Sequence, residues 1–553
     1  MKNRGLPVLV ILGLVILLVF TAIGLKFMNE EAEEENRAQN VQGISIALDE
    51  KSMEKQRDLE RTYLEQLEKG NYTEENMLVI GNPYGISPLT ALVLFKTDEP
   101  AKVTVEVPGN TDDAAITYSL DDYKTTHKVP VLGLLSETAN EVSITVEKAN
   151  GVVTENVLTI TTGKLPEYIG TVDVKIAETE KMELGGSALT FFVPSTKYAY
   201  AFDTNGDVRW YCTRYNSHVF QELENGHILF LTKEKNSGQT YNILVEMDYL
   251  GKYHRIYELS SEYHAAEAKG NESTIIHHDA IELPNGNFLL TVNADEKYIE
   301  DVMIEIERDT GRIVKTIDLK ELFPAPFYEK YRATKREDGK IDWFHQNSVV
   351  YDKTDNSIII SGRHQDTVMK INYDTNEIVW ILAAHEGWPS RYKEVLLRPE
   401  GKDFKFPAAQ HTAVIMPDQD GNEDTIDILV YDNNVVISRG DKNQSEKFSR
   451  AVQYRINEKQ KTVKEIWSFG EQFGEAYFTR IVGSVRYLPE TGNRLINFGY
   501  MDQDTRSGIF EVGEDGGVVM EAYVTDFPAG SRAYRAERFS LYNGKWEVRL
   551  EES

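Results

Sequence analysis

The chain has 553 residues, which exceeds one ordinary compact domain but can be largely absorbed by a repeat architecture such as a β-propeller. Its formal net charge of -29 argues against nucleic acid as a partner, because nothing basic offsets the repulsion of phosphates. A single cysteine, Cys212, excludes an intramolecular disulfide framework and a cysteine-based zinc site.

The N-terminal segment, residues 1–28, has the features of a membrane anchor. Lys2 and Arg4 precede an uncharged apolar run from Leu6 to Leu25, about 20 residues, which is enough to span the hydrocarbon core as a helix. The flank that follows is acidic, so the positive-inside rule predicts a single-pass cell-membrane protein whose bulk lies outside the cytoplasm. A cleaved signal peptide is the alternative, and the protein would then be secreted.

Residues 29–76 form an acidic linker with a helical pattern. Met53, Leu59, Tyr63 and Leu67 recur at helical spacing, which predicts a stalk helix or a short coiled coil. Such a stalk permits a homodimer without requiring one. A solvated spacer is the alternative interpretation of the same segment.

Residues 77–166 change to short alternating strands separated by Gly, Pro, Asn and Asp turns. The expected strands include Ala91–Phe95, Lys102–Val107, Glu141–Glu147 and Val157–Thr161. This spacing is typical of a small β-sandwich of fibronectin type III character, and it carries no evident chemistry.

An internal repeat fills residues 167–553, with its first clear copies from about Lys181. One half of the unit is an apolar strand, a turn of the Asn-Gly kind, and a second apolar strand. Its copies start at His218, His278, Asn347, His411, Gly483 and, weakly, Arg538. The other half is a hairpin with an Asp-x-Gly-like turn, as in "YAYAFDTNGDVRWY". Six copies of each half predict an all-β fold, a six-bladed propeller of four-stranded blades whose last strand pair closes a blade begun at the N-terminal end.

Histidines share one register of this repeat. His218 and His278 lie seven residues before the Asn of Asn-Gly, while His278, His411 and Gly483 lie six residues before a turn proline. His345 and Asn347 enter the next blade at nearly the same level, and Arg363 ends that blade's second strand. The innermost strands of a propeller line its central channel, so we expect these side chains to converge on one opening. Strand capping is the simpler explanation for any one of them.

The residue types in this cluster suit an oxyanion. Imidazoles together with a guanidinium can bind a planar or tetrahedral anion, and histidine can also act as a nucleophile, acid or base. Metal binding is the main competitor, since histidine-rich sites suit zinc, copper or nickel. No carboxylate or thiolate of the repeat joins the cluster convincingly, and Arg363 would repel a cation. We therefore expect neither a metal nor a cofactor.

Four short motifs occur in order along the blades: "HHD" at His277–Asp279, "WFHQNS" at Trp343–Ser348, "SGRHQD" at Ser361–Asp366 and "QHT" at Gln410–Thr412. Each is weak alone, but together they resemble the active-site motifs of the bacterial arylsulfate sulfotransferases. The resemblance covers nearly all of residues 77–553. It implies an enzyme that moves a sulfuryl group from an aryl sulfate to a phenol by a ping-pong route through a sulfated histidine, with no nucleotide donor.

The resemblance also implies roles for individual residues. His411 matches the sulfated nucleophile. His345, Arg363 and Asn347 match the residues that hold the sulfuryl oxygens. His278 matches the proton-transfer residue, although the adjacent His277 leaves the register uncertain by one position.

Other parts of the match are weaker or depart from the family. Ser484, which starts the inner strand of the next blade, is a weak candidate for substrate contact. Periplasmic members of the family carry a structural disulfide and a cleaved signal, whereas this chain has only Cys212 and looks anchored. Aromatic side chains proposed to stack on the phenols are Trp343, Phe344, Trp388 and Phe406. The histidines expected to be ordinary surface or packing residues include His127, His254, His264, His364 and His385.

Two other functions remain open at this point. Hairpins such as "FDTNGDVRWY" resemble the repeats of quinone-cofactor dehydrogenases and related assembly factors, although Trp recurs in only some blades. A non-enzymatic extracellular propeller that binds glycans or proteins is the second alternative. The first predicts quinone binding, and the second predicts no requirement for His411.

Overall fold

The computed structural model describes residues 40–41, 43–234, 241–261, 274–502, 505–528 and 530–551. The predicted anchor, residues 1–28, lies outside these residues, as does His264. Within them, no helix is both long enough and apolar enough to cross a membrane. The described part of the chain is an all-β structure with one long helix and several short helical turns.

The helix predicted in the linker is present as α2, Glu50–Lys69, with Asp49 capping its first turn by accepting a hydrogen bond from the amide of Ser52. It is not a solvated spacer, because Gln56 is buried and bonds both the carbonyl of Gly251 and the amide of Tyr253. The residues just before it form strands rather than a continuous helix. These are β1, Asn40–Val41, and β2, Ile44–Leu48, which pairs with the edge of a sheet.

Five strands form the small domain: β3, Leu78–Gly81; β4, Thr90–Val107; β5, Ile116–Leu132; β6, Ala139–Lys148; and β7, Val153–Thr161. The two strands expected at 91–95 and 102–107 are halves of the single strand β4. Its pairing register shifts between Lys96 and Ala101. The first half pairs with β3 and the second with β6, so a bulged strand links two parts of the domain where the sequence suggested a turn.

The remaining described strands form six sheets, each of which runs from an innermost strand to an outer edge. From the innermost strand outward, the first sheet contains β33 (Ala533–Phe539), β9 (Leu189–Pro194), β10 (Tyr198–Phe202) and β11 (Val208–Tyr215), and the second contains β12 (Phe220–Glu222), β13 (Ile228–Thr232), β14 (Ile243–Met247) and β15 (Tyr253–Ser261), followed by β2 and β1. The third sheet contains β16 (Ile276–Glu282), β17 (Phe288–Val292), β18 (Val302–Ile306) and β19 (Ile313–Asp318), and the fourth contains β20 (Gln346–Asp352), β21 (Ser357–Gly362), β22 (Thr367–Asn372) and β23 (Ile378–Leu382). The fifth sheet contains β25 (His411–Ile415), β26 (Thr425–Asp432), β27 (Arg450–Asn457), β28 (Thr462–Phe469) and β24 (Arg398–Pro399), and the sixth contains β29 (Ser484–Tyr487), β30 (Arg494–Met501), β31 (Arg506–Val512), β32 (Val518–Thr525) and β8 (Thr171–Ala177). A short helix, α3 (Pro326–Glu329), lies in the loop between β19 and β20.

Closure of the repeat follows the prediction in one respect and departs from it in others. The C-terminal strand β33 adds to β9 and completes the sheet begun near the N-terminal end. The last repeat starts earlier than Arg538, however, and residues 545–550 form no strand. Three sheets also exceed four strands, because β2, β8 and β24 add to their outer edges. These additions cover edges that would otherwise expose unpaired backbone groups.

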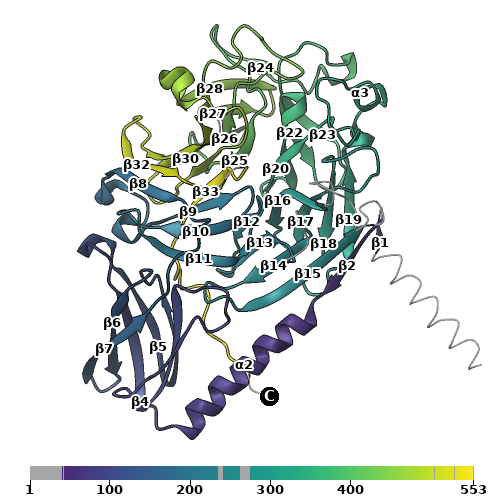
Figure 1. Cartoon of the computed structure of the whole chain (residues 1–553). Helices are drawn as coiled ribbons and strands as arrows, with labels where there is room; N and C mark the ends of the chain where they lie inside the picture. The colour runs from purple at the N-terminus through teal and green to yellow at the C-terminus, as the bar shows by residue number, and fades with distance from the viewer. Residues whose placement is uncertain are drawn as a thin grey trace, which may run out of the picture.

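The innermost strands meet one another (Figure 1). Contacts run from β16 to β20, β25, β29 and β33 in turn, and a Gln221–Asp279 hydrogen bond joins β12 to β16. Side chains at one repeat position fasten neighbouring sheets: Ser348 Oγ accepts from the amide of Ala413, and Ser484 Oγ accepts from the amide of Ala536. These bonds tie the beginnings of neighbouring innermost strands together.

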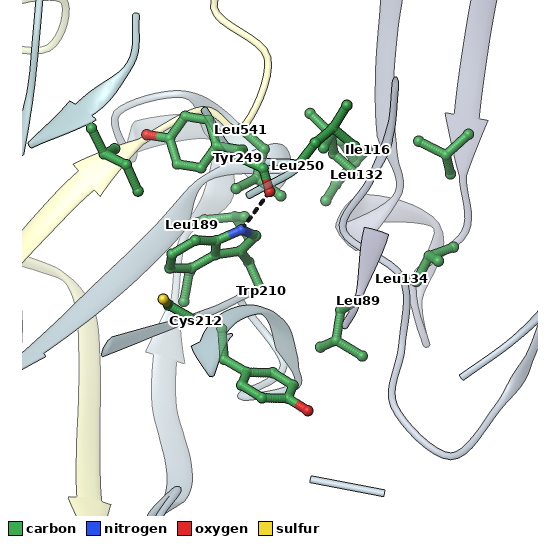
Figure 2. Close-up of a cluster of buried hydrophobic side chains, with 14 of the residues drawn as sticks. Leu89, Ile116, Leu132, Leu134, Leu189, Trp210, Cys212, Tyr249, Leu250 and Leu541 are labelled. Atoms are coloured by element: carbon green, nitrogen blue, oxygen red, sulfur yellow. Dashed lines mark hydrogen bonds between the residues drawn. The ribbon is translucent and has the colours of Figure 1, made fainter. Parts of the chain in front are cut away.

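A hydrophobic cluster joins the small domain to the first two sheets. Trp210 is fully buried and donates its indole N–H to the carbonyl of Tyr249 at 2.9 Å. Figure 2 shows Leu89 and Leu132 of the small domain facing this tryptophan, with Leu541 of the C-terminal segment on the same cluster. The small domain is therefore packed into the fold rather than tethered to it.

We expect Trp210→Ala to lower the free energy of unfolding by about 3–5 kcal/mol, because it removes a large buried side chain and leaves a cavity. Denaturant unfolding followed by circular dichroism measures this loss. Trp467, which lies on a partly buried strand, is the matched control. If Trp210→Ala and Trp467→Ala lowered the free energy of unfolding equally, the cluster around Trp210 would not be a main source of stability.

Candidate functional site

A cavity of about 610 Å³ opens where the innermost strands begin. His277, His278, His345, Arg363 and His411 all line it, as does His218. A larger cavity of about 1100 Å³ lies between α2, β5 and the C-terminal segment, but it contains none of these residues. The repeat register thus brings the predicted imidazoles and the guanidinium to one place, as the sequence indicated.

Irregular backbone aims these side chains. His218, His278 and His345 have φ values of 60°, 46° and 54°, which non-glycine residues rarely adopt. The pairing of β16 with β17 and of β25 with β26 shifts register directly beside His278 and His411. Such bulges rotate a side chain away from the regular alternation of a strand. Strained conformations of this kind cost about 1–3 kcal/mol each and gather at functional sites.

His411 is held as a neutral imidazole with one free nitrogen. Its Nδ1 lies 2.7 Å from Oδ1 of Asn433, and Nδ2 of Asn433 donates to the carbonyls of Thr479 and Val482. Those two bonds fix the amide so that Oδ1 faces His411, and Nδ1 must therefore carry the proton. Burial, reinforced by the charge of Arg363, holds the pKa of His411 well below its usual value. Its Nε2 keeps a lone pair and is ready to act as a nucleophile.

His345 is held as an imidazolium. Its Nδ1 lies 2.6 Å from Oε2 of Glu300 and 2.7 Å from Oδ2 of Asp342. Burial lowers the pKa of His345, but the two carboxylates outweigh this effect and raise it to about 9. The ring therefore brings a positive charge to the cavity at neutral pH.

Arg363 has a positioned but uncompensated guanidinium. Its Nη1 donates to Nε2 of His364 at 2.9 Å, and Nδ1 of His364 donates to the carbonyl of Asp342 at 2.6 Å. Among the described residues, no carboxylate lies within ion-pair distance of Arg363, and its Nε has no hydrogen-bond partner. Burial lowers the pKa of Arg363, although the nearby Asp342 opposes this. The guanidinium is thus oriented by neutral groups and keeps its charge for a ligand.

Two adjacent histidines, His277 and His278, complete the cluster beside His345. Nδ1 of His277 lies 3.1 Å from Nδ1 of His278, and the His278 ring lies 4.7 Å from that of His345. Burial lowers the pKa of both residues, against the pull of Glu300, so both are neutral at pH 7. Either can accept a proton. Both histidines line the cavity, so the geometry does not decide which of them transfers the proton.

Asn347 and Ser484 lie beside the cavity rather than on its lining. Asn347 is fully buried and donates through Nδ2 to the carbonyl of Gln410, directly before His411. Ser484 is fully buried and bonds the neighbouring strand β33. In this structure both side chains support the backbone around the cluster. The proposed aromatic platforms also lie elsewhere, because Trp343, Phe344, Trp388 and Phe406 pack in hydrophobic clusters and none lines the cavity.

The sequence matches two family models that together cover most of the chain. Residues 155–535 match the arylsulfotransferase model and residues 78–163 match the arylsulfotransferase Ig-like domain. The chain belongs to the arylsulfotransferase family. The enzyme class expected from the four motifs is thereby confirmed at the level of the family.

Individual relatives agree with this assignment. The chain is 25% identical to an arylsulfate sulfotransferase AssT of Escherichia coli over 535 residues, which cover 76% of this chain and 84% of that protein. It is 23% identical to the AssT of Lelliottia amnigena, with 79% and 86% covered. Among solved structures, a periplasmic gluconolactonase of Pseudomonas aeruginosa is 9% identical, with a TM-score of 0.32 and coverage of 78% of this chain and 98% of that one.

Several residues around this cavity were missed by the sequence analysis. Glu300 and Asp342 join the histidine cluster from loops outside the repeat strands, so the argument against a metal, which considered only carboxylates of the repeat, overlooked them. Two groups of side chains have the spacing of metal ligands, because within each group the nitrogen and oxygen atoms that could bind a metal lie within 4.8 Å of one another. The first group is His277, His278 and Glu300, and the second is Asp342, His345 and His364. His364, expected to be an ordinary residue, instead orients Arg363.

Tyr534 was also missed by the sequence analysis, although it occupies a position of the repeat. It takes the register position of His218, His278 and His411 in strand β33, and its ring lies 4.3 Å from that of His218. Its hydroxyl donates to the carbonyl of Asn347 at 3.0 Å. The C-terminal repeat lacks a turn of the Asn-Gly kind at the matching distance, so its register was placed too late.

The cavity is locally basic in an acidic chain. The cationic residues on its lining are Lys197, Arg336, Lys340, Arg363 and Arg532, against the carboxylates of Glu300 and Asp338. The formal net charge of the whole chain is -29. A local excess of positive groups in a concave site attracts anions over the opposing field of the molecule. The composition of the lining therefore favours an anionic ligand at this opening.

Proposed function

We propose that this arylsulfotransferase carries a sulfuryl group from an aryl sulfate to a phenol in two steps, through a sulfated His411. One observation carries the proposal: a neutral imidazole with a free nitrogen shares a cavity with two cationic groups, Arg363 and His345. A sulfate ester requires a nucleophile at sulfur and positive charge on the non-bridging oxygens. We also propose that the six sheets are the blades of a six-bladed propeller around this cavity.

In the first step, Nε2 of His411 attacks sulfur and the bond from sulfur to the aryl oxygen breaks. The Nε2–S bond forms, and Arg363 and His345 stabilise the charge on the sulfuryl oxygens. Asn433 accepts from Nδ1–H and so stabilises the imidazole as it gains positive character. The departing aryl oxide takes a proton, and a phenol leaves.

In the second step, an acceptor phenol loses its proton and attacks the same sulfur, which regenerates His411. His278 is neutral in the free protein and is therefore suited to accept that proton. The anionic ester raises the pKa of His278 when it binds, because an opposite charge favours the imidazolium, and this lets the same residue supply the proton in the first step. His277, at 3.1 Å, is the neighbour through which the proton can be shared.

Alternative functions have less support. Membership of the arylsulfotransferase family favours transfer over quinone chemistry or passive ligand binding. The location outside the cytoplasm, the membrane anchor and a homodimer through the stalk stay predictions.

The deciding experiment is a transfer assay with 4-nitrophenyl sulfate as donor and phenol as acceptor. We expect phenol to accelerate release of 4-nitrophenolate, phenyl sulfate to form in equal amount, and double-reciprocal plots to run parallel, as in ping-pong kinetics. Without acceptor, we expect mass spectrometry to find one SO₃ group on the peptide that contains His411. Absence of transfer, or intersecting plots with no adduct, would contradict the proposal.

The pH dependence tests the imidazolium of His345. Its pKa is raised, so the charge is present at neutral pH and is lost as pH rises through about 9. We expect the donor half-reaction to fall over that range. Glu300→Gln removes one of the two carboxylates, which lowers the pKa of His345 and moves the alkaline limb of the profile by about one unit or more to lower pH. Glu305→Gln, outside the cavity, is the control and should leave the profile unchanged.

A further inference from the structure

The cavity carries more positive charge than the proposed transfer uses. Arg363 and His345 meet the sulfuryl group, while Lys197, Lys340 and Arg336 also line the cavity. They come from different loops: Lys197 from the turn between β9 and β10, the other two from the long segment between α3 and β20. Their convergence at one opening is therefore a product of the fold and not of a local charge run.

Two of these side chains are not neutralised. Arg336 is paired with Asp338, with Nη2 2.7 Å from Oδ2. Within the described parts of the chain, no carboxylate lies within ion-pair distance of the side chain of Lys340 or of Lys197. The Nζ of Lys197 lies 4.5 Å from the ring centroid of Tyr168 and 4.8 Å from that of Tyr215, so cation–π contacts hold its ammonium at the edge of the cavity. Both ammonium groups therefore add positive charge to the basic cavity without a carboxylate partner at ion-pair distance among the described residues, and this charge favours the binding of an anion.

The apolar residues of the lining and the volume of the cavity indicate what kind of anion would fit. Tyr241, Ile299, Val482 and Tyr534 contribute apolar surface to the same lining. The volume of about 610 Å³ falls in the range of pockets that enclose drug-sized ligands and exceeds what a bare phenol fills. An aromatic ring with a negative group at a distance from its reacting hydroxyl suits this combination.

We propose that the acceptors of this enzyme are phenols that carry a second, anionic substituent, bound by Lys340 and Lys197 while the hydroxyl reaches the sulfated His411. This inference rests on the proposed sulfuryl transfer and adds a substrate class to it. A carboxylate and a sulfonate present the same chemistry to a lysine, which acts as a point charge without the planar fork of arginine. The product of the transfer is then a doubly anionic molecule, an aryl sulfate that keeps its second anionic group.

The test compares two acceptors of nearly equal phenol acidity, 4-hydroxyphenylacetate and its neutral amide, 4-hydroxyphenylacetamide, with 4-nitrophenyl sulfate as donor. We expect kcat/KM to be about ten-fold higher for the acid at low salt, because a basic cleft raises the local concentration and the association rate of anions. The preference should fall as ionic strength rises. A third acceptor, (4-hydroxyphenyl)methanesulfonate, distinguishes a carboxylate site from a sulfonate site by which acid is preferred.

Variants assign the effect to the lysines. Lys340→Gln and Lys197→Gln should each lower the preference for the acid, and the double variant should bring the ratio of the two kcat/KM values close to one. Lys335→Gln, an exposed lysine of the same segment that does not line the cavity, is the matched control. Equal rates for acid and amide in the unmodified protein, or a preference that survives the double variant, would overturn this inference alone. Failure to transfer to either acceptor would overturn the proposed function itself.

Discussion

Replacing His411 by alanine is expected to lower kcat/KM for 4-nitrophenyl sulfate by roughly 10⁴-fold or more, since the loss of a covalent nucleophile has effects of this size in other enzymes. The SO₃ adduct on the chain should disappear with it. The fold should survive, because the ring of His411 lies on the cavity and its one hydrogen bond goes to Asn433.

Two further variants test whether His411 acts as the nucleophile or whether loss of any histidine would lower activity. Asn433→Ala leaves His411 in place but frees its Nδ1, so we expect a smaller loss of activity than in His411→Ala. His385→Ala is the matched control, since that histidine bonds the carbonyl of Leu397 away from the cavity and should leave kcat/KM unchanged. Near-normal transfer by His411→Ala would sink the sulfohistidine route. An adduct found on another residue would reassign the nucleophile.

The convergence of the histidines was predictable because repeat geometry converts spacing into position. His278 and His411 stand at one distance from their turns, and a hairpin of fixed length returns the chain to the same level of the sheet. The bulges beside these residues could not be read from the sequence, since they insert irregular backbone where the pattern suggests a regular strand. They alter the direction of the side chains without moving them from the opening.

The partners of the histidines were much harder to predict. Glu300 and Asp342 lie in loops that precede β18 and β20, and no periodicity assigns a loop residue to a level of the fold. His364 sits in a short helical turn directly after β21. The charge state of His345 depends on contacts with Glu300 and Asp342 that are made only in space. The repeat pattern could therefore locate the clustered imidazoles but not the groups that set their protonation.

The edge strands show the same limit. β2 and β8 lie far along the chain from the sheets they join, and neither belongs to a repeat copy. Their attachment depends on which strand edges the folded sheets leave open. The helix α2 was predictable because its apolar spacing is local, whereas the partners of its buried Gln56 lie about 200 residues further along the chain, at Gly251 and Tyr253.

Arg363 gives the second large effect that we expect, and it bears on both halves of the reaction. Arg363→Met should lower kcat/KM by roughly 10²–10³-fold, the usual result of removing one group that stabilises a developing oxyanion. Arg363→Lys should recover part of this loss, because an ammonium restores the charge but not the two-pronged geometry. Arg455→Met, which removes an arginine paired with Asp427 away from the cavity, is the control for the loss of a partly buried guanidinium.

The role of Arg363 is decided by whether its replacement lowers kcat/KM equally for the donor and for the acceptor. Both transition states hold the same SO₃ group between His411 and an aryl oxygen, so a residue that grips its oxygens must lower kcat/KM for the donor and for the acceptor by similar factors. A residue that binds only one aryl group would lower one value and spare the other. Single-turnover measurements of each half-reaction therefore test the role of Arg363 more sharply than overall activity does. A loss confined to the donor half-reaction would move Arg363 from the sulfuryl group to the leaving phenol.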